Sequence, residues 1–364
     1  MKILMTADAV GGVWTYTLEL ARSLRAFDAE VFIATMGPRP SPQQTEAATT
    51  IGNVSLFVSE YRLEWMEDPW RDIDAAGESL LGIEQKCKPD IVHINGYAHA
   101  ALPFRAPTVL VAHSCVFSWW QAVHAAWPPA SWDEYEWRVT RGLDAAAAVV
   151  APSMTMLRAL RMCYGYESPG RVIPNARSID TFAPADKKDL VMAAGRVWDE
   201  GKNLGVLMAA ADRLSWPVHI AGPDTAPDGT RITSPAVVML GHLAEPALAN
   251  ALAQAAIFVH PAVYEPFGLS VLEAALSGCA LVLSDIASLR ENWDGAAVFV
   301  PPRDEDALAD AVEYLIGFAD ERRALARRAR DRALLFAPER MGRAYMNLYQ
   351  RLTTSRTAGL ACAS

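Results

Sequence analysis

Two glutamates flank a short turn in the C-terminal half of the chain, at a spacing that suits a nucleotide ligand. Glu265 stands in the turn before Gly268, and Glu273 lies one turn into the helix that we expect to begin there. The first amides of such a helix have no partners within it, so they form a site for an anion. A nucleotide sugar carries hydroxyls on both sides of its diphosphate. We therefore expect Glu265 to take those of the sugar and Glu273 those of the ribose; the alternative is a capping acid followed by a surface acid.

Two cations lie in the loop after the predicted strand 190–194, where the ligands of parallel sheets collect. Arg196 and Lys202 can neutralise a diphosphate leaving group without a metal ion, because both charges are fixed by the loop. The alternative is an exposed loop with ordinary charges. A P-loop ATPase is disfavoured, because the loop has one residue too many between its glycines and Asn203 replaces the Ser or Thr of a P-loop.

The N-terminal half offers two weaker features. Gly11 and Gly12 follow the first predicted strand, where glycine lets the backbone approach a ligand closely. His113 ends the predicted strand 108–112 and is expected to face the ligand, although a lone histidine is as readily structural. No G-x-G-x-x-G follows the first strand, which disfavours a dinucleotide dehydrogenase.

The acidic and thiol residues predict neither a metal site nor a disulfide framework. Asp72 and Asp74 have the D-x-D spelling of metal-using sugar transferases, but they fall in a predicted helix, where residues two apart do not face one another. Asp304 and Asp306 open a later helix as a cap and first-turn acids. The five cysteines are widely spaced without a C-x-x-C pair, so a reducing cytoplasm fits best.

The composition is that of an ordinary globular enzyme. A formal net charge of −9 argues against a nucleic-acid binder, and the apolar runs are too short to span a bilayer, so at most peripheral membrane contact is expected. Tryptophans crowd the segment 119–137, which would stack on acceptor sugars, meet a membrane interface or belong to the core. The small, polar tail from residue 353 is expected to fray.

The elements that must position these residues alternate between strand and helix along the whole chain. The predicted strands of the first half are 2–6, 30–35, 54–58, 90–94, 108–112, 147–150 and 172–173. Those of the second half are 190–194, 218–221, 237–240, 257–260, 280–283 and 297–300, with helices at 204–214, 248–256, 269–277 and 307–318. Such alternation implies parallel sheets covered by helices on both faces. We predict an α/β fold of two Rossmann-like domains facing a cleft, residues 1–182 on the acceptor side and 183–337 on the donor side.

These motifs together resemble glycosyltransferase family 4. Glu265-Pro-Phe-Gly-Leu with Glu273 matches the E-x7-E signature of that family, and Gly195-Arg196 with Lys202-Asn203 matches its G-R…K-N loop. Further landmarks occur in the family's order: Gly11-Gly12, Asp90-Ile-Val-His93, Val111-Ala-His113, Ile173-Pro-Asn175 and Leu240-Gly241-His242. The resemblance runs from residue 1 to about 352. One departure is Ala176, where the family usually has glycine, and it puts the local turn in doubt.

The resemblance implies a GT-B fold and a reaction type. A helix at 338–352 would cross back to the N-terminal domain, so that residues 338–364 belong with 1–182. The reaction would be retaining, metal-independent transfer of a hexose from a nucleotide diphosphate sugar, with no cofactor beyond that co-substrate.

The resemblance also assigns roles to individual residues of the two domains. His113 and Glu265 would contact the donor sugar, and Glu273 the ribose. The diphosphate would be held by Arg196, Lys202 and the amides of Phe267, Gly268 and Leu269. The loop of Gly11 and Gly12 would approach the phosphates and acceptor, and the base would lie near His242 and Leu243.

The identity of the donor and two rival functions stay open. A UDP-sugar is the first expectation and GDP-mannose the second; the acceptor would be a glycan, a lipid-linked sugar or a small molecule, as in polysaccharide biosynthesis. The rivals are a GT-B nucleotide-sugar epimerase and a non-catalytic nucleotide-sugar sensor or partner subunit. Interconversion of donors without acceptor would indicate the epimerase, whereas the presence of both Glu265 and Lys202 disfavours the sensor.

Overall fold

The chain divides into two compact α/β units. The computed structural model describes residues 1–362. Unit 1 comprises residues 1–118 and 126–175 together with the C-terminal segment from Pro338, and unit 2 comprises 119–125 and 176–337. The sequence-based boundary after residue 182 falls a little beyond this division, in the segment that precedes the second sheet. The short segment 119–125 is the part of the N-terminal half that packs within unit 2.

Unit 1 is built on a seven-stranded parallel sheet in the order β3-β2-β1-β4-β5-β6-β7. Its strands are β1 (Lys2–Asp8), β2 (Glu30–Met36), β3 (Val54–Phe57), β4 (Ile91–Ile94), β5 (Thr108–Val111), β6 (Ala148–Ala151) and β7 (Arg171–Val172). Every pairing is parallel, as the alternation of strands and helices predicts. The carboxyl ends of these strands therefore meet at one edge, where His113 follows β5.

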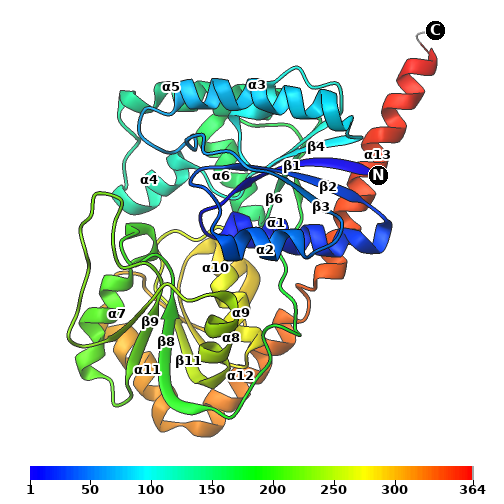
Figure 1. Ribbon diagram of the computed structural model, residues 1–364. Helices are drawn as coiled ribbons and strands as arrows, with labels where there is room; N and C mark the ends of the chain where they lie inside the picture. Colours follow the sequence, from blue (N-terminus) through cyan, green and yellow to red (C-terminus); the bar gives the residue numbers. More distant parts are fainter. Residues whose placement is uncertain (363–364) are drawn as a thin grey trace. The chain divides into compact units, whose positions relative to one another are not determined.

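Helices cover both faces of this sheet (Figure 1). They are α1 (Gly12–Leu24), α2 (Pro42–Thr49), α3 (Trp70–Cys87), α5 (Asp133–Ala145), α6 (Met154–Tyr164) and α13 (Pro338–Cys362), with short 3-10 turns at Arg25–Phe27, Ala98–Ala101 and Ala130–Trp132. Helix α4 (Val116–His124) begins in unit 1, and its residues from Trp119 onward belong to unit 2. Helices α3, α5 and α6 pack on one face through Leu80, Leu143 and Leu160. Helix α1 lies on the other side and contacts α13, which confirms the expected return of the C-terminal helix to the first unit.

Unit 2 repeats the design with six parallel strands in the order β10-β9-β8-β11-β12-β13. The strands are β8 (Lys188–Ala194), β9 (Val218–Ala221), β10 (Val238–Gly241), β11 (Ala255–His260), β12 (Ala280–Ser284) and β13 (Val298–Val300). The helices are α7 (Leu204–Ala210), α8 (Glu245–Gln254), α9 (Leu269–Leu276), α10 (Ala287–Trp293), α11 (Glu305–Gly317) and α12 (Ala319–Ala333), with 3-10 turns at Glu200–Lys202 and Ala211–Arg213. The predicted elements are confirmed, with boundaries displaced by a few residues.

Two layers of helices enclose the second sheet (Figure 1). Leu252 of α8, Val271 of α9 and Ala329 of α12 belong to one buried cluster, whereas Leu207 of α7 and Val312 of α11 belong to the cluster on the opposite face. Central strands such as β11 are buried along their whole length, which explains their continuous apolar sequence.

The C-terminal helix is longer than its sequence suggests. The prediction of a frayed tail from Thr353 is wrong as far as Cys362, because α13 continues to that residue. The hydroxyls of Thr353 and Thr354 donate to the carbonyls of Tyr349 and Gln350 one turn earlier, which is how threonine is accommodated inside a helix. Within residues 1–362 no helix is both long and apolar enough to cross a membrane.

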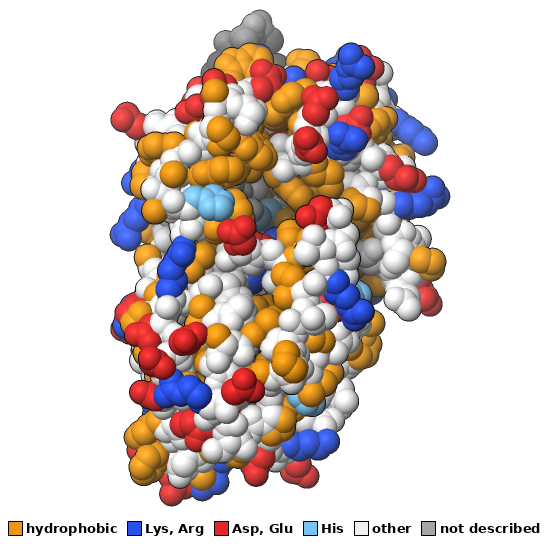
Figure 2. Space-filling model, turned by 90° about the vertical axis from the view of Figure 1, so that its left-hand side faces the viewer, with side chains coloured by type: hydrophobic (Ala, Val, Ile, Leu, Met, Phe, Trp, Pro, Cys, Tyr) orange, Lys and Arg blue, Asp and Glu red, His pale blue; other side chains and the backbone are white. Residues whose placement is uncertain are grey.

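Charges of both signs are interspersed over the surface that Figure 2 shows. The arginine-rich run near residue 330 forms part of α12, where Arg322, Arg330 and Arg332 donate to backbone carbonyls and Arg323 pairs with Asp320. These arginines therefore serve as local structural groups of a helix, as their spacing among acids and alanines predicts.

Candidate active site

Glycines allow the strands of unit 2 to end close together at the carboxyl edge of its sheet. Gly195 follows β8, and its amide donates to the carbonyl of Ala221 at 2.9 Å. Gly222, with φ of 140°, follows β9, and a Cβ placed on it would lie 1.8 Å from the carbonyl oxygen of Gly195. Only glycine fits there. The loop that carries Arg196 and Lys202 begins directly after this close backbone contact.

Glu265 is the most densely contacted side chain at this edge. Its Oε2 accepts from Lys202 Nζ at 2.7 Å and from His260 Nε2 at 3.1 Å, and its Oε1 accepts from the Gly268 amide at 2.9 Å. Burial opposes ionisation of the Glu265 carboxyl, but the charge of Lys202 and the bond from His260 outweigh it and hold its pKa well below the usual range. Glu265 is therefore an ionised carboxylate at neutral pH.

His260 is a site residue that the sequence analysis did not select. It ends β11 and is 1% exposed. Because the Glu265 carboxylate can only accept, His260 Nε2 carries the proton and holds Glu265 from the strand side. The available sequence signal was its place at the end of a buried strand next to the Glu265 turn, the same signal that pointed to His113.

Arg196 is linked to Asp199 within the same loop. Its guanidinium donates to Asp199 Oδ2 at 3.2 and 2.6 Å, while Asp199 Oδ1 accepts from the Gly201 amide at 2.9 Å and from Trp119 Nε1 at 3.2 Å. Burial opposes ionisation of Asp199, but Arg196 and Lys202 lower its pKa. Arg196 is 36% exposed, so it is held in place and still accessible to an anion.

Lys202 contacts Glu265, whereas the neighbouring Asn203 has a structural role. Asn203 adopts a left-handed conformation with φ of 53°, and its Nδ2 donates to the carbonyls of Pro261 and Pro302 at 2.8 and 2.5 Å. These bonds tie the loop after β8 to the loops that follow β11 and β13. Asn203 thus fixes the position from which Lys202 reaches Glu265.

The start of α9 has the geometry expected of an anion site, although Glu265 already occupies part of it. Gly268 caps the helix with φ of 91°, which favours glycine. The Glu265 carboxylate contacts the Gly268 amide, so the capping role that we weighed as the alternative is present alongside the contact with Lys202. Phe267 is buried and Leu269 opens the helix. Whether these amides hold a diphosphate stays a prediction.

Glu273 is a buried carboxylate and not a surface acid. It is 7% exposed, and its Oε1 lies 2.8 Å from Arg177 Nε.

The residues predicted to lie near the base follow β10 at the same edge of the sheet. They are His242, which is exposed, and Leu243, which packs against the core. Ala176, which replaces the family's usual glycine, is absent from the described residues with positive φ, so the turn there does not require glycine.

In unit 1, His113 belongs to a hydrogen-bonded network at the carboxyl edge of the first sheet. Asn95 Oδ1 contacts His113 Nε2 at 2.8 Å and His93 Nε2 at 3.2 Å, and Asn95 Nδ2 donates to the carbonyl of Thr6 at 2.6 Å. Because that carbonyl orients the Asn95 amide, its Oδ1 must accept, and both histidines carry their proton on Nε2. His113 therefore presents its unprotonated Nδ1 as an acceptor.

The same network reaches the C-terminal helix. His93 Nδ1 accepts from Tyr349 of α13 at 2.6 Å, and the ring of Tyr16 on α1 packs edge-on against His113 at 4.5 Å. Gly11 caps α1 with φ of 79°, and both Gly11 and Gly12 are exposed. The sequence analysis missed Asn95 and the two tyrosines, because their partners are far apart in the chain.

Acid should weaken the folding of unit 1 through its buried histidines. Burial, with a smaller effect of His113, lowers the pKa of His93 to about 3, whereas an unfolded histidine titrates near 6.5. The unfolded chain thus binds more protons between these values, so stability falls as pH drops below about 6.5, by roughly 2 kcal/mol at pH 5 for His93 alone.

The measurement is the free energy of unfolding in urea at pH 7 and pH 5. We expect His93→Gln to be less stable at pH 7 but to lose less on acidification than wild type. His124→Gln, at an exposed position, serves as the control and should keep the wild-type difference. An unchanged pH difference in His93→Gln would contradict the assignment.

Other predicted features have structural partners. Asp72 accepts from the Arg62 amide and Asp74 pairs with Arg138, both within unit 1, so their side chains are engaged away from the site residues. Of the tryptophans in segment 119–137, Trp119 holds Asp199, whereas Trp127 and Trp137 are 55% and 50% exposed. The segment is thus partly structural and partly surface.

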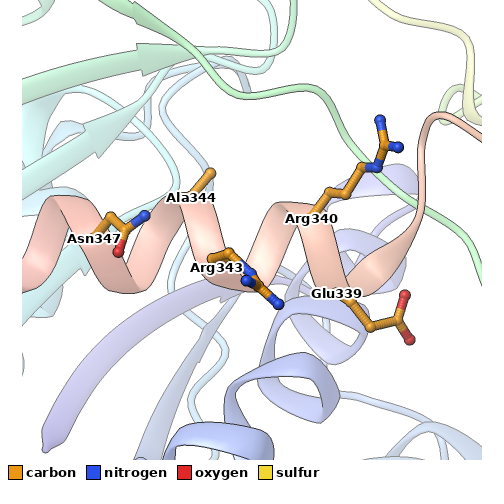
Figure 3. Close-up of a pocket in the computed structure, with 5 residues that line it drawn as sticks. All are labelled: Glu339, Arg340, Arg343, Ala344 and Asn347. Atoms are coloured by element: carbon orange, nitrogen blue, oxygen red, sulfur yellow. The ribbon is translucent and has the colours of Figure 1, made fainter.

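A separate open pocket of about 430 Å³ lies along α13. Figure 3 shows that its labelled side chains all come from this one helix: Glu339, Arg340, Arg343, Ala344 and Asn347. They include none of the residues of either site cluster. We assign this surface pocket no role in the reaction.

Two glycosyltransferase family models match this chain, one in each half. Residues 10–181 match the model of Glycosyltransferase Family 4, and residues 188–317 match that of Glycosyl transferases group 1. An alpha-maltose-1-phosphate synthase of Mycolicibacterium smegmatis is 27% identical over 65% of this chain and 70% of its own length. A GDP-mannose-dependent alpha-mannosyltransferase of the same organism is 28% identical over 68% of this chain and 72% of its own.

Solved structures show the same fold. A sucrose-phosphate synthase from Thermosynechococcus elongatus superimposes with a TM-score of 0.83 at 19% identity, covering 98% of this chain and 100% of that one. Anabaena HepE in complex with UDP-glucose gives 0.75 at 15% identity, with coverage of 98% and 100%. The fold class is that of GT-B glycosyltransferases. The chain belongs to the glycosyltransferases described by the family 4 and group 1 models.

Proposed function

We propose that this glycosyltransferase transfers a hexose from a nucleotide diphosphate sugar with retention of anomeric configuration and without a metal ion. The observation that carries the proposal is the contact of Lys202 with Glu265 beside the start of α9. It brings a cation, an ionised carboxylate and helix amides together at the carboxyl edge of one sheet. A diphosphate joined to a sugar needs groups of these three kinds.

Each group has a defined task in this reaction. Lys202 and Arg196 stabilise the negative charge that develops on the departing diphosphate, aided by the amides of Phe267, Gly268 and Leu269. The Glu265 carboxylate accepts from Lys202, His260 and the amides of Gly268 and Phe267, and the longest of these contacts, 3.5 Å from the Phe267 amide, gives way to a sugar hydroxyl. The protein thus positions the donor and stabilises the leaving group.

His113 supplies a contact from unit 1. Its unprotonated Nδ1 can accept a hydrogen bond from a hydroxyl of the donor sugar, since Asn95 holds the proton on Nε2. We propose front-face substitution, in which an oxygen of the departing phosphate takes the proton of the acceptor hydroxyl as the new glycosidic bond forms. No protein nucleophile is then required, in keeping with the contacts that hold Glu265 to Lys202 and His260.

The donor is proposed to be a UDP-sugar, with GDP-mannose as the second choice. The structural neighbour HepE binds UDP-glucose, whereas two relatives are GDP-mannose-dependent mannosyltransferases. The acceptor is proposed to be a glycan, a lipid-linked sugar or a small molecule. A reducing compartment such as the cytoplasm is proposed on the four buried cysteines that are free thiols: Cys87, Cys115, Cys163 and Cys279.

Turnover is expected to survive EDTA. Arg196 and Lys202 place two cations at the proposed diphosphate site, and the part of the chain that the structure describes has no group of three or more His, Cys, Asp or Glu side chains that could hold a metal ion. The measurement is nucleoside diphosphate release from UDP-sugars and GDP-mannose with and without chelator. Loss of turnover that manganese or magnesium restores would contradict the proposal. Donor interconversion without acceptor would instead support an epimerase.

A further inference from the structure

A buried arginine joins the proposed ribose carboxylate to a second helix. Arg177 is 2% exposed; its Nε lies 2.8 Å from Glu273 Oε1 on α9, and its Nη2 pairs with Glu245, the first residue of α8. The guanidinium also lies over the ring of Phe182, 4.7 Å from the centroid. Three segments of unit 2 are thus fixed to one side chain.

This arrangement sets the position of Glu273 and not merely its charge. An isolated buried carboxylate is costly, and a paired one is tolerated when its partner has good geometry. A planar guanidinium can reach two carboxylates at fixed angles, which the ammonium of a lysine does not reproduce. Because the guanidinium of Arg177 packs over Phe182 and its Nη2 pairs with Glu245, Arg177 has little freedom to move away from Glu273.

We infer that Arg177 is a positioning residue that holds Glu273 in the orientation that recognises the ribose hydroxyls, and so sets a preference for ribonucleotides over 2′-deoxyribonucleotides. The inference rests on the proposed binding of a nucleotide sugar in unit 2. Arg177 contacts Oε1 of the Glu273 carboxylate, and a carboxylate has about four lone-pair positions that can accept hydrogen bonds. Removal of Arg177 lets the carboxylate turn away, and the ribose contact is lost.

The test compares the affinities of UDP and 2′-deoxy-UDP, with GDP and 2′-deoxy-GDP as a second pair, by calorimetry. Wild type is expected to prefer the ribonucleotide by at least about tenfold, as a hydrogen bond to a charged group allows. In Arg177→Met, ribonucleotide affinity should fall about tenfold while deoxynucleotide affinity changes little, so that the ratio approaches one. Loss of stability alone would not alter the ratio for the folded fraction.

Two further variants sharpen the test. Arg213→Met removes another arginine of unit 2 that pairs with two carboxylates, those of Asp306 and Asp310, and should keep the wild-type ratio. Arg177→Lys keeps the charge but not the planar guanidinium, so we expect a smaller ratio of ribonucleotide to deoxyribonucleotide affinity. This variant replaces Arg177→Met if Arg177→Met does not fold. A wild-type ratio in both folded Arg177 variants would overturn the inference. A wild-type protein that binds none of these nucleotides would overturn the proposed function itself.

Discussion

Replacing Lys202 with methionine is expected to lower turnover by about a hundredfold or more, the loss typical of one well-placed group that stabilises transition-state charge. The substitution keeps the apolar stem that packs over Gly195 but removes the ammonium. It deprives the diphosphate of a cation and leaves the largely buried Glu265 with His260 and the amides of Phe267 and Gly268 as its described partners. Nucleoside diphosphate affinity should fall with turnover, because the charge is present in both the ground and transition states.

The matched control is Lys187→Met in the same unit. Lys187 is more exposed than Lys202, and its ammonium donates to the carbonyls of Ser277 and Leu252 at the ends of two helices. Its loss should lower the melting temperature and leave the folded fraction active. Lys202→Met that folds and turns over within tenfold of wild type would remove Lys202 from the proposed site.

Replacing His113 with alanine is expected to lower turnover at least tenfold while nucleoside diphosphate affinity stays nearly unchanged. A lost transition-state contact costs on the order of a hundredfold in rate. His113 belongs to unit 1, whereas the proposed diphosphate site belongs to unit 2, so the two properties should separate. Burial lowers the pKa of His113 to about 3, so the neutral ring is the working form throughout the neutral range.

Three measurements on the same His113 variant distinguish a catalytic from a structural role. The melting temperature measures the stability lost with the Asn95 and Tyr16 contacts. Titration with UDP or GDP measures nucleotide affinity, which we assign to unit 2, and turnover measures the reaction rate. A destabilised protein with normal turnover per folded molecule would return His113 to the structural interpretation.

The sequence could predict the two sheets because each strand of these parallel sheets is a short apolar run with a helix pattern beside it. β11 and β12 are buried at every residue, and their continuous apolar sequences can be recognised without knowledge of the fold. Glu265 and Glu273 were also recognisable, since their spacing places both at the start of one helix. Local order sufficed for these features.

Features that depend on distant partners were not predictable in this way. Arg177 has no sequence feature that marks it, because Glu245 and Glu273 meet it only after the sheet has formed. Asn95 likewise gains its role from Thr6 and His113, which reach the same edge through strand order. Segment 119–125 belongs to unit 2, where Trp119 donates to Asp199, a partner far away in the sequence. The tryptophan content of the segment alone did not distinguish a core role from a surface role for these residues.

The most direct test of the account is the anomeric configuration of the product in the presence of EDTA. Purified protein is incubated with UDP-glucose or GDP-mannose, whichever raises its melting temperature more, and a panel of simple glycoside acceptors; a ligand of the native state raises that temperature. Both donors carry an α-linked sugar, and the one-bond coupling between C1 and H1 of the product reports its configuration. The account predicts an α-linked product that forms in chelator and forms about a hundredfold more slowly, or slower still, with Lys202→Met. A β-linked product, or one formed only when a divalent metal is restored, would contradict it.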